Sequence, residues 1–154
     1  MTQITAEAGV KELKDALAAG DEPHLLTGDQ YKQTLRDGRR IVDCTGAEVG
    51  DVTAHPHLAR TADSIAAVMD LQFDPASRDV VTYVDEETGT RRAVGWQVPT
   101  TKEHLHAKRE GIKAITRQTL GMYGRPPDYG PAMALGFLGI IDRVERENPE
   151  FAQN

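Results

Sequence analysis

Apolar side chains near the start of the chain recur at the spacing of a helix. Val10, Leu13 and Leu17 follow one another at intervals of three and four residues, which predicts an amphipathic helix over residues 5–19. Gly20 ends this helix, because glycine is favoured just beyond a helix C-terminus. The acidic stretch at residues 21–23 then forms a linker.

A second helix is predicted to begin at Thr27. Gln30 stands three residues later, and this spacing is typical of a capping box, in which two side chains satisfy the first free backbone N–H groups. Gly38 is the expected end of the helix. A third helix opens near Pro56, carries apolar residues such as Val68 up to Phe73, and closes at residues 74–75, where a proline follows an aspartate.

Two pairs of β-prone segments predict two small hairpins. Residues 40–42 and 47–49 flank a Cys-Thr-Gly turn, and residues 80–84 and 91–96 flank the acidic turn at 85–89. The sequence therefore predicts a mainly α fold that contains two β-hairpins.

The longest helix is expected over residues 102–122, started by a capping box of Thr100 and Glu103. Its apolar stripe consists of Leu105, Ile112, Ile115 and Leu120. A loop over residues 121–128 holds two glycines and two adjacent prolines, which excludes regular structure. A last helix is predicted over residues 129–147, and its two glycines at 136 and 139 form a flat strip that another helix can approach.

Composition excludes several classes of protein. The chain has 154 residues, a formal net charge of -6 and a pI of about 5.3, whereas general nucleic-acid binding requires a basic face. Its apolar stretches are too short to span a bilayer, no signal peptide is evident, and the single Cys44 forbids an internal disulfide. These features predict a soluble, cytoplasmic, globular protein. Mean hydropathy of -0.48 and 5% aromatic residues fit a chain that completes its core on a partner, and equally an ordinary small helical protein.

Most candidate metal ligands and catalytic residues lack the spacing or the neighbours that such sites require. His104 and His106 lie two apart on a predicted helix and point to different faces, so they cannot share a metal, and no paired cysteines exist. Cys44 has no neighbour that would lower the pKa of its thiol. Nucleotide-binding glycine motifs and a nucleophile elbow are missing from the sequence. The sequence therefore predicts no metal site and no catalytic cysteine.

The loop before the last helix is the strongest candidate site. Within residues 121–129 it places Tyr123, Arg125, Asp128 and Tyr129 between two helices. An arginine here can face an anionic ligand, and a tyrosine can donate a hydrogen bond to it. The alternative is that Arg125 pairs with Asp128 while both tyrosines pack. The residues alone leave both interpretations open.

Four segments in order resemble one family. GMYGRPPDY, at residues 121–129, resembles the GMMGRSPDY-type signature of the oxygenase component of 4-hydroxyphenylacetate 3-hydroxylases. LTGDQYKQTLRDGRRIV, DVTAHPHLARTADSIAAVMDLQFDP and VVTYVDEETGTRRAVGW are similar to the segments that precede it in that family. Chlorophenol monooxygenases and, more distantly, 4-hydroxybutyryl-CoA dehydratase are relatives. The resemblance covers Leu26 to Asn154 and leaves residues 1–25 as an N-terminal extension.

The resemblance implies the N-terminal helical domain of an acyl-CoA-dehydrogenase-like flavoenzyme. It implies that Arg125 and Tyr129 are catalytic and bind the substrate, and that Tyr123 also contacts it. A cation beside a phenol lowers its pKa, so Arg125 would favour the more nucleophilic phenolate. Tyr129 would orient the substrate by a hydrogen bond, and Asp128 would shape the loop. Pro126 departs from the family, where a small polar residue is usual.

The family's enzymes are considerably longer, and continue into a β-domain and a C-terminal helical bundle. The resemblance therefore implies the small subunit of a split, heteromeric monooxygenase, active only with a large subunit that carries those parts. That enzyme would use O2 and reduced FAD, which a separate flavin reductase supplies and the partner mostly holds, to hydroxylate a phenolic or related aromatic substrate. One alternative is a non-catalytic binding or regulatory module derived from the domain. Another is a fragment of a full-length oxygenase.

Overall fold

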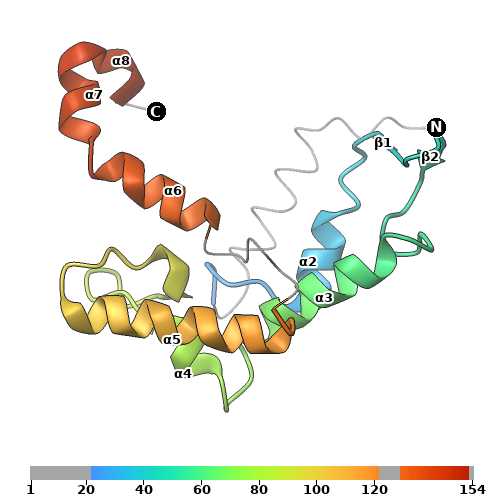
Figure 1. Ribbon diagram of the computed structural model, residues 1–154, viewed down its shortest axis with the longest axis horizontal. Coiled ribbons are helices and arrows are strands. Elements are labelled where there is room, and N and C mark those ends of the chain that lie inside the picture. Colours follow the sequence, from blue (N-terminus) through green and yellow to red (C-terminus); the bar gives the residue numbers. More distant parts are fainter. Residues whose placement is uncertain (1–21, 122–128, 153–154) are drawn as a thin grey trace.

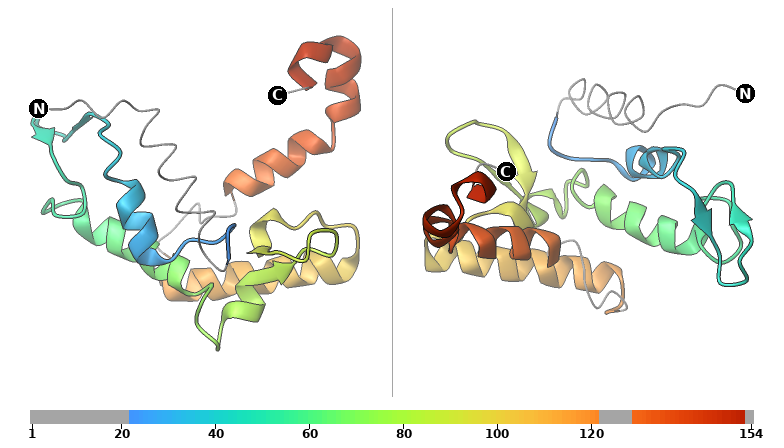
Figure 2. Two further views of the ribbon diagram at one scale, coloured as in Figure 1. Left: turned by 180° about the vertical axis from the view of Figure 1, so that it is seen from behind. Right: turned by 90° about the horizontal axis from the view of Figure 1, so that it is seen from above.

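The computed structural model describes residues 22–121 and 129–152, so the helix predicted over residues 5–19 lies outside the described part. The described chain is mainly helical with two small antiparallel hairpins, as the sequence predicts (Figure 1). Helices α2 and α3 and the first hairpin lie at one end of the molecule. Helices α4 and α5 and the second hairpin lie at the other, and α6 leads away from them to α7 and α8 (Figures 1 and 2).

Helix α2 (Gly28–Thr34) begins at the predicted capping box. The Thr27 hydroxyl accepts a hydrogen bond from the backbone N–H of Gln30 at 3.2 Å, and the Gln30 side chain accepts one from the backbone N–H of Thr27 at 2.8 Å. The helix ends at Thr34 rather than Gly38, because the N–H groups of Leu35 and Arg36 donate hydrogen bonds to carbonyls three residues back instead of four. Gly38 instead adopts a φ of 81° in the turn towards β1.

Helix α3 (Ala59–Asp70) packs against α2 through small residues. Gly28 is buried, and its backbone N–H donates to the Asp70 carboxylate at 2.7 Å. A side chain at Gly28 would come within 2.7 Å of the Ala66 carbonyl oxygen. Val68 is buried, and so are the alanines at 62 and 66. The close approach of the two helices thus depends on glycine and alanine.

The first hairpin pairs β1 (Ile41–Val42) with β2 (Glu48–Val49) and confirms its prediction. Its turn is closed by the Asp43 carboxylate, which accepts hydrogen bonds from the backbone N–H groups of Thr45 at 2.8 Å and Ala47 at 3.0 Å. Gly46 allows the turn to reverse, with a φ of 87°.

The second hairpin pairs β3 (Thr82–Val84) with β4 (Arg91–Ala93), in register from Thr82 opposite Ala93 to Val84 opposite Arg91. Its predicted strands were too long. Helix α4 (Arg78–Val81) replaces the start of the first strand, and the 3-10 helix η1 (Val94–Trp96) replaces the end of the second. The physical reason is packing: Val81 and Val94 are buried at the turns that lead into and out of the hairpin, and this outweighs their β propensity.

Helix α5 (Lys102–Gln118) is capped by Thr101 and not by the predicted Thr100. The Thr101 hydroxyl accepts a hydrogen bond from the backbone N–H of His104 at 3.2 Å. It ends at Gln118 instead of residue 122. Leu120 and Gly121 adopt left-handed φ values of 52° and 72°, and the Gly121 N–H bonds to the Thr116 carbonyl, which closes the last turn.

The predicted apolar stripe of α5 is half right. Ile112 and Ile115 are half-buried, whereas Leu105 and Leu120 are 57% and 88% exposed. The tightest contact of α5 is instead made by Gly111, because a Cβ atom there would lie 2.4 Å from Val94 Cγ1. The absence of a side chain at this position lets α5 rest directly on η1 and α4.

The single helix predicted over residues 129–147 is wrong, because it is broken into α6 (Tyr129–Leu138) and α7 (Ile141–Glu147), followed by α8 (Pro149–Ala152). The break lies at residues 139–140, where the Ile140 N–H bonds to the carbonyl of Phe137, three residues back. The predicted strip at Gly136 and Gly139 is exposed, and within the described ranges no other helix packs on it.

The buried core is small. Its apolar members are Leu25, Val49, Ala62, Ala66, Val68, Val81 and Val94. Over residues 22–121 and 129–150, no large side chain is completely buried. The described part of the chain therefore buries little apolar surface.

Candidate functional site

The structure places one of the three predicted site residues. Tyr129 is the first residue of α6, and its side chain is 48% exposed. Tyr123 and Arg125 lie outside the described residues, as does Asp128. The roles expected of Arg125, Tyr129 and Tyr123 in substrate binding therefore stay predictions.

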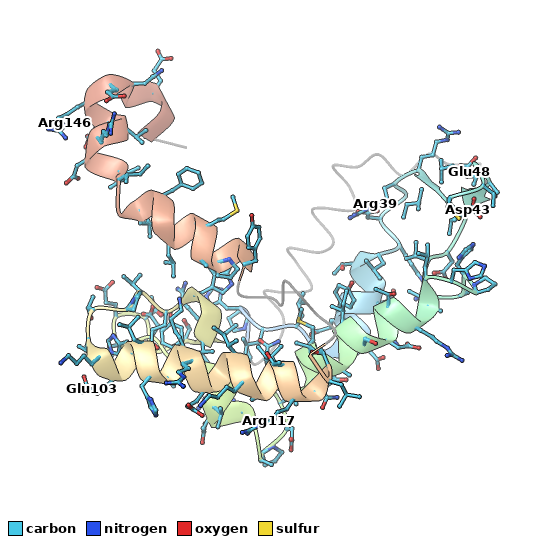
Figure 3. The ribbon with its side chains drawn as sticks, in the orientation of Figure 1. Arg39, Asp43, Glu48, Glu103, Arg117 and Arg146 are labelled. Carbon is cyan, nitrogen blue, oxygen red and sulfur yellow. The ribbon has the colours of Figure 1, made fainter. Side chains whose placement is uncertain are left out.

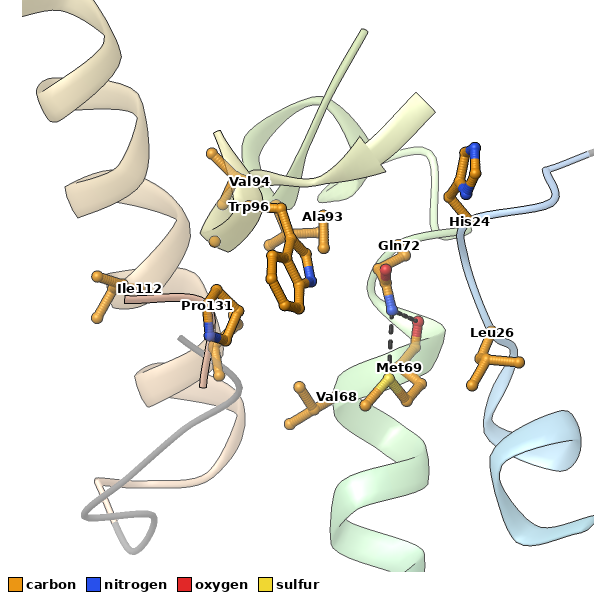
Figure 4. Close-up of a pocket in the computed structure, with 13 residues that line it drawn as sticks. His24, Leu26, Val68, Met69, Gln72, Ala93, Val94, Trp96, Ile112 and Pro131 are labelled. Atoms are coloured by element: carbon orange, nitrogen blue, oxygen red, sulfur yellow. Dashed lines mark hydrogen bonds between the residues drawn. The ribbon is translucent and has the colours of Figure 1, made fainter. Parts of the chain in front are cut away.

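An open cavity of about 260 Å³ lies close to the start of α6 (Figure 4). Trp96 and Pro131 face one another across it, with Val68 and Met69 of α3 and Ile112 of α5 around them. Pro131 is two residues beyond Tyr129, but Tyr129 does not line the cavity. The described lining residues are His24, Leu26, Val68, Met69, Gln72, Val81, Ala93, Val94, Gly95, Trp96, Ile112, Ile115 and Pro131.

The few polar groups of the cavity decide what it can accept. Gln72 is 8% exposed, and its amide donates to the Met69 carbonyl at 3.2 Å and lies 3.4 Å from the Met69 sulfur. Trp96 is 50% exposed and offers a broad aromatic surface. The walls are otherwise apolar, and the volume lies just below the ~300–1,000 Å³ of typical ligand pockets. The cavity thus suits one aromatic ring.

Among the described residues, the lining of the cavity contains no lysine or arginine that could match the charge of a pyrophosphate. The described lining therefore suits an uncharged aromatic group better than the pyrophosphate of FAD.

An ion-pair cluster holds the rim of the cavity in place. Arg78 of α4 donates a hydrogen bond to Glu22 and forms an ion pair with it. Arg91 of β4 lies 3.9 Å from the same Glu22 and 3.0 Å from Asp79, and it also donates to the Thr82 hydroxyl at 2.8 Å. The segment that carries His24 is thereby tied to the second hairpin.

Cys44 and His55 lie at the first hairpin, whereas His104 lies in the first turn of α5. His55 lies 3.8 Å from Asp43, and His104 contacts the Thr100 hydroxyl at 3.2 Å. No group of side chains within the described ranges could hold a metal ion. Cys44 is exposed in the turn of the first hairpin. Figure 3 shows Asp43 in that hairpin, well away from Glu103 at the start of α5 and Arg117 near its end.

Among residues 22–121 and 129–152, no helix combines the length and apolar character that a membrane span requires.

A helical domain with two hairpins in this arrangement is the N-terminal helical domain of acyl-CoA-dehydrogenase-like flavoenzymes. Residues 27–154 match the model of the family described as 4-hydroxyphenylacetate 3-hydroxylase N terminal, and the chain belongs to this family. The family expected from the four sequence segments is confirmed.

The relatives are oxygenase components. The chain is 36% identical over 128 residues to the 4-hydroxyphenylacetate 3-monooxygenase oxygenase component of Thermus thermophilus. The aligned segment covers 83% of this chain and 25% of the relative. It is 37% identical over 104 residues to the oxygenase component of 4-nitrophenol 4-monooxygenase/4-nitrocatechol 2-monooxygenase of Rhodococcus opacus, covering 67% of this chain and 19% of the relative. The FADH(2)-dependent monooxygenase TftD of Burkholderia cepacia is 38% identical to this chain over 105 residues. The aligned segment covers 68% of this chain and 20% of TftD.

A solved structure agrees with the sequence relatives. The oxygenase component of 4-hydroxyphenylacetate 3-monooxygenase, crystallised in complex with FAD, superposes with a TM-score of 0.74 at 34% identity, over 83% of this chain and 26% of that one. The chain thus spans about a quarter of the length of the curated relatives that it matches first.

Sequence reasoning missed the cavity. The sequence predicts Trp96 at the end of a strand and Gln72 near the end of a helix, whereas both line the same cavity. A signal was available in Trp96, the only tryptophan of the chain, which follows directly after a glycine. A large ring beside a flexible residue, however, does not reveal which distant helices enclose it.

Proposed function

We propose that this chain is the small subunit of a split two-component monooxygenase that hydroxylates a phenolic or related aromatic substrate in the cytoplasm. Residues 26–154 form its hydroxylase-type domain, and residues 1–25 are an extension. A large subunit carries the β-domain and the C-terminal helical bundle, and the isolated chain is inactive. The main support is family membership together with relatives that are named as oxygenase components, of which the matched segment makes up about a quarter.

The flavin belongs mostly to the partner in this proposal. The related oxygenase component was crystallised with FAD, whereas the described lining of the cavity offers no cation for a pyrophosphate. Reduced FAD, delivered by a separate reductase, supplies the electrons for the reduction of O2. One oxygen atom enters the aromatic ring and the other leaves as water.

The residues of this chain bind and orient the substrate. We place Arg125 beside the substrate oxygen, where its positive charge lowers the pKa of the phenol and favours the phenolate. Tyr129 donates a hydrogen bond to the same oxygen, and Tyr123 contacts the substrate beside them in the assembled enzyme. The position of Tyr129 at the first residue of α6 supports this role, because a residue at a helix start is held by a rigid element while its side chain reaches outward.

Two substitutions test the assignment in the assembled enzyme. Arg125→Ala should reduce product formation about 10- to 100-fold, because a hydrogen bond to a charged group contributes roughly 1.5–3 kcal/mol. It should also move the pH dependence of the rate upwards, towards the pKa of the free phenol, because the phenolate is no longer favoured. Tyr129→Phe should reduce the rate less and leave the pH dependence in place.

Matched controls use a similar residue elsewhere. Arg117 is exposed near the end of α5, and Tyr83 lies in β3, so Arg117→Ala and Tyr83→Phe should turn over like the wild type. Oxygen uptake and product formation are measured with reduced FAD, the chain and its large subunit, together and singly. If the purified complex binds no flavin and oxidises nothing, the chain is a binding or regulatory module instead. If the two site variants match the wild type, the site assignment is wrong.

A further inference from the structure

Helix α6 is unusual because it has no polar face. Its ten residues, YGPAMALGFL, include no charged side chain. Helix α5, in contrast, carries charged residues along most of its length, KEHLHAKREGIKAITRQ. A helix that is apolar on every side belongs in an interior, where all of its surface is removed from water.

Helix α6 is nevertheless open to solvent. It contacts the rest of the described chain mainly at η1, and Pro131 is its one buried residue. From there it extends away from α5 (Figures 1 and 2). Five large side chains form what we call the α6–α7 apolar patch: Met133, Phe137, Leu138, Ile140 and Ile141, with exposures of 48, 59, 57, 48 and 36%.

The patch is large enough to be an interface. If each of the five side chains exposes about 100 Å², the patch approaches the upper end of the ~300–600 Å² found for the largest patch on a typical monomer. The small residues between them, such as Ala132 and Gly136, are exposed too and enlarge this surface. A standard protein interface takes about 800 Å² from each partner, so the patch would form most of one side.

The chemistry of the patch fits a protein better than a membrane. A helix that lies on a membrane usually carries lysine or arginine on a polar face, and α6 has neither. The adjoining α7 carries charges of both signs, with Asp142, Glu145 and Glu147 beside Arg143 and Arg146. A partner with an apolar groove, flanked by charges of both signs, would cover both helices.

The relatives indicate which protein supplies this groove. At 36% and 33% identity, two of them contain a segment like this chain that makes up about a quarter of their own length. We propose that the α6–α7 apolar patch is the docking surface for the separate large oxygenase subunit, which corresponds to the remaining three-quarters of those relatives. This inference rests on the proposed function, since it uses the same partner.

A photo-cross-link at the patch tests the proposal. The full chain, tagged and carrying a benzophenone amino acid in place of Phe137, is produced in its native cells and irradiated. The expected product joins this chain to one larger polypeptide, which peptide sequencing identifies as the counterpart of the rest of an aromatic oxygenase. The same amino acid in place of Thr88, exposed at the tip of the second hairpin, should give no such product.

The affinity of the large subunit for a variant with a charge in the patch is a second test. Phe137→Asp should weaken binding of the purified large subunit at least about 30-fold, as expected for a residue at the centre of an interface. Thr88→Asp should leave the affinity unchanged. Circular dichroism and thermal unfolding establish that both variants fold, which is expected because both side chains are exposed.

Several results would overturn the docking surface. These are a cross-link from position 137 to a second copy of this chain, to its own residues 1–21, or to a continuation of the same polypeptide. Flotation of the chain with lipid vesicles that Phe137→Asp abolishes, or unchanged affinity in that variant, would do the same.

Oxygen uptake on the same complex separates this inference from the proposed function. A complex that cross-links at position 137 but consumes no oxygen with reduced FAD retains the docking surface and refutes the monooxygenase. An active complex whose cross-link is absent at position 137 refutes the docking surface alone.

Discussion

Replacing Gly111 with alanine tests how closely α5 rests on η1 and α4. In an open helix this change stabilises the protein by about 1 kcal/mol, because alanine has the higher helix propensity. Here the new Cβ atom would lie 2.4 Å from Val94 Cγ1 and 3.0 Å from the Val80 carbonyl oxygen. Val94 is only 2% exposed, and Val80 contributes a backbone atom, so neither can move away easily.

The overlap outweighs the helical gain. Adding a methyl group to a packed interior costs roughly 1–3 kcal/mol, and the closeness of this contact places Gly111→Ala at the upper end of that range. After the gain in propensity, we expect the free energy of unfolding to fall by about 2 kcal/mol, and Tm by about 4–8 °C for a chain of this size.

Urea and thermal unfolding followed by circular dichroism measure both quantities. Gly136→Ala is the matched control, because Gly136 also lies within a helix but has no atom within 4 Å of the added Cβ. This control should be neutral or more stable by up to about 1 kcal/mol. If Gly111→Ala were as stable as Gly136→Ala, α5 would not be held against Val94 as described.

Three further changes probe the α2–α3 end and its turns. Thr27→Ala removes a capping side chain and should lower the free energy of unfolding by about 1 kcal/mol in urea titrations. Gly28→Ala forces a Cβ atom to within 2.7 Å of an α3 carbonyl and should cost more than Thr27→Ala in the same assay. The pKa values of Asp43 and Asp51 are lowered mainly by a hydrogen bond from the hydroxyl of Thr45 or Thr53, respectively, and next by one from the backbone N–H of the same threonine. Because the folded pKa lies below the unfolded one, these carboxylates stabilise the fold above about pH 4, and the contribution is lost as the pH falls further. Tm should drop between pH 5 and pH 3, and less so in Thr53→Ala; equal slopes would refute the role of Thr53.

The sequence predicts best where a local interaction decides the structure. Thr27 and Gln30 form their capping box between neighbours in the chain, and the first hairpin is set by its own short turn. Such features need no knowledge of the tertiary structure. The mainly α class with two hairpins follows from the same kind of signal.

The failures occur where distant contacts decide. Val80 and Val81 are β-prone, yet they become helical because Val81 is buried against elements later in the chain. The predicted stripe of α5 includes Leu120, which is almost fully exposed once the helix ends at Gln118. The break after Leu138 is equally hidden, because glycines are tolerated within a helix as well as at its end.

The candidate site shows the same division. The resemblance pointed to residues 121–129, of which the structure describes only Gly121 and Tyr129. The cavity beside them is assembled from α3, α5, η1 and the segment around His24, which are far apart in the sequence. No spacing rule joins these parts, so only the folded chain reveals them.

The chain has one cysteine and one tryptophan, and both are accessible. A thiol-reactive dye can therefore be attached at the tip of the first hairpin without any mutation. Trp96 is then a natural energy donor for that dye, and it reports at the same time on the cavity that it lines. Fluorescence of the unmodified sequence can thus follow ligand entry and the relative movement of the two ends of the domain in one sample.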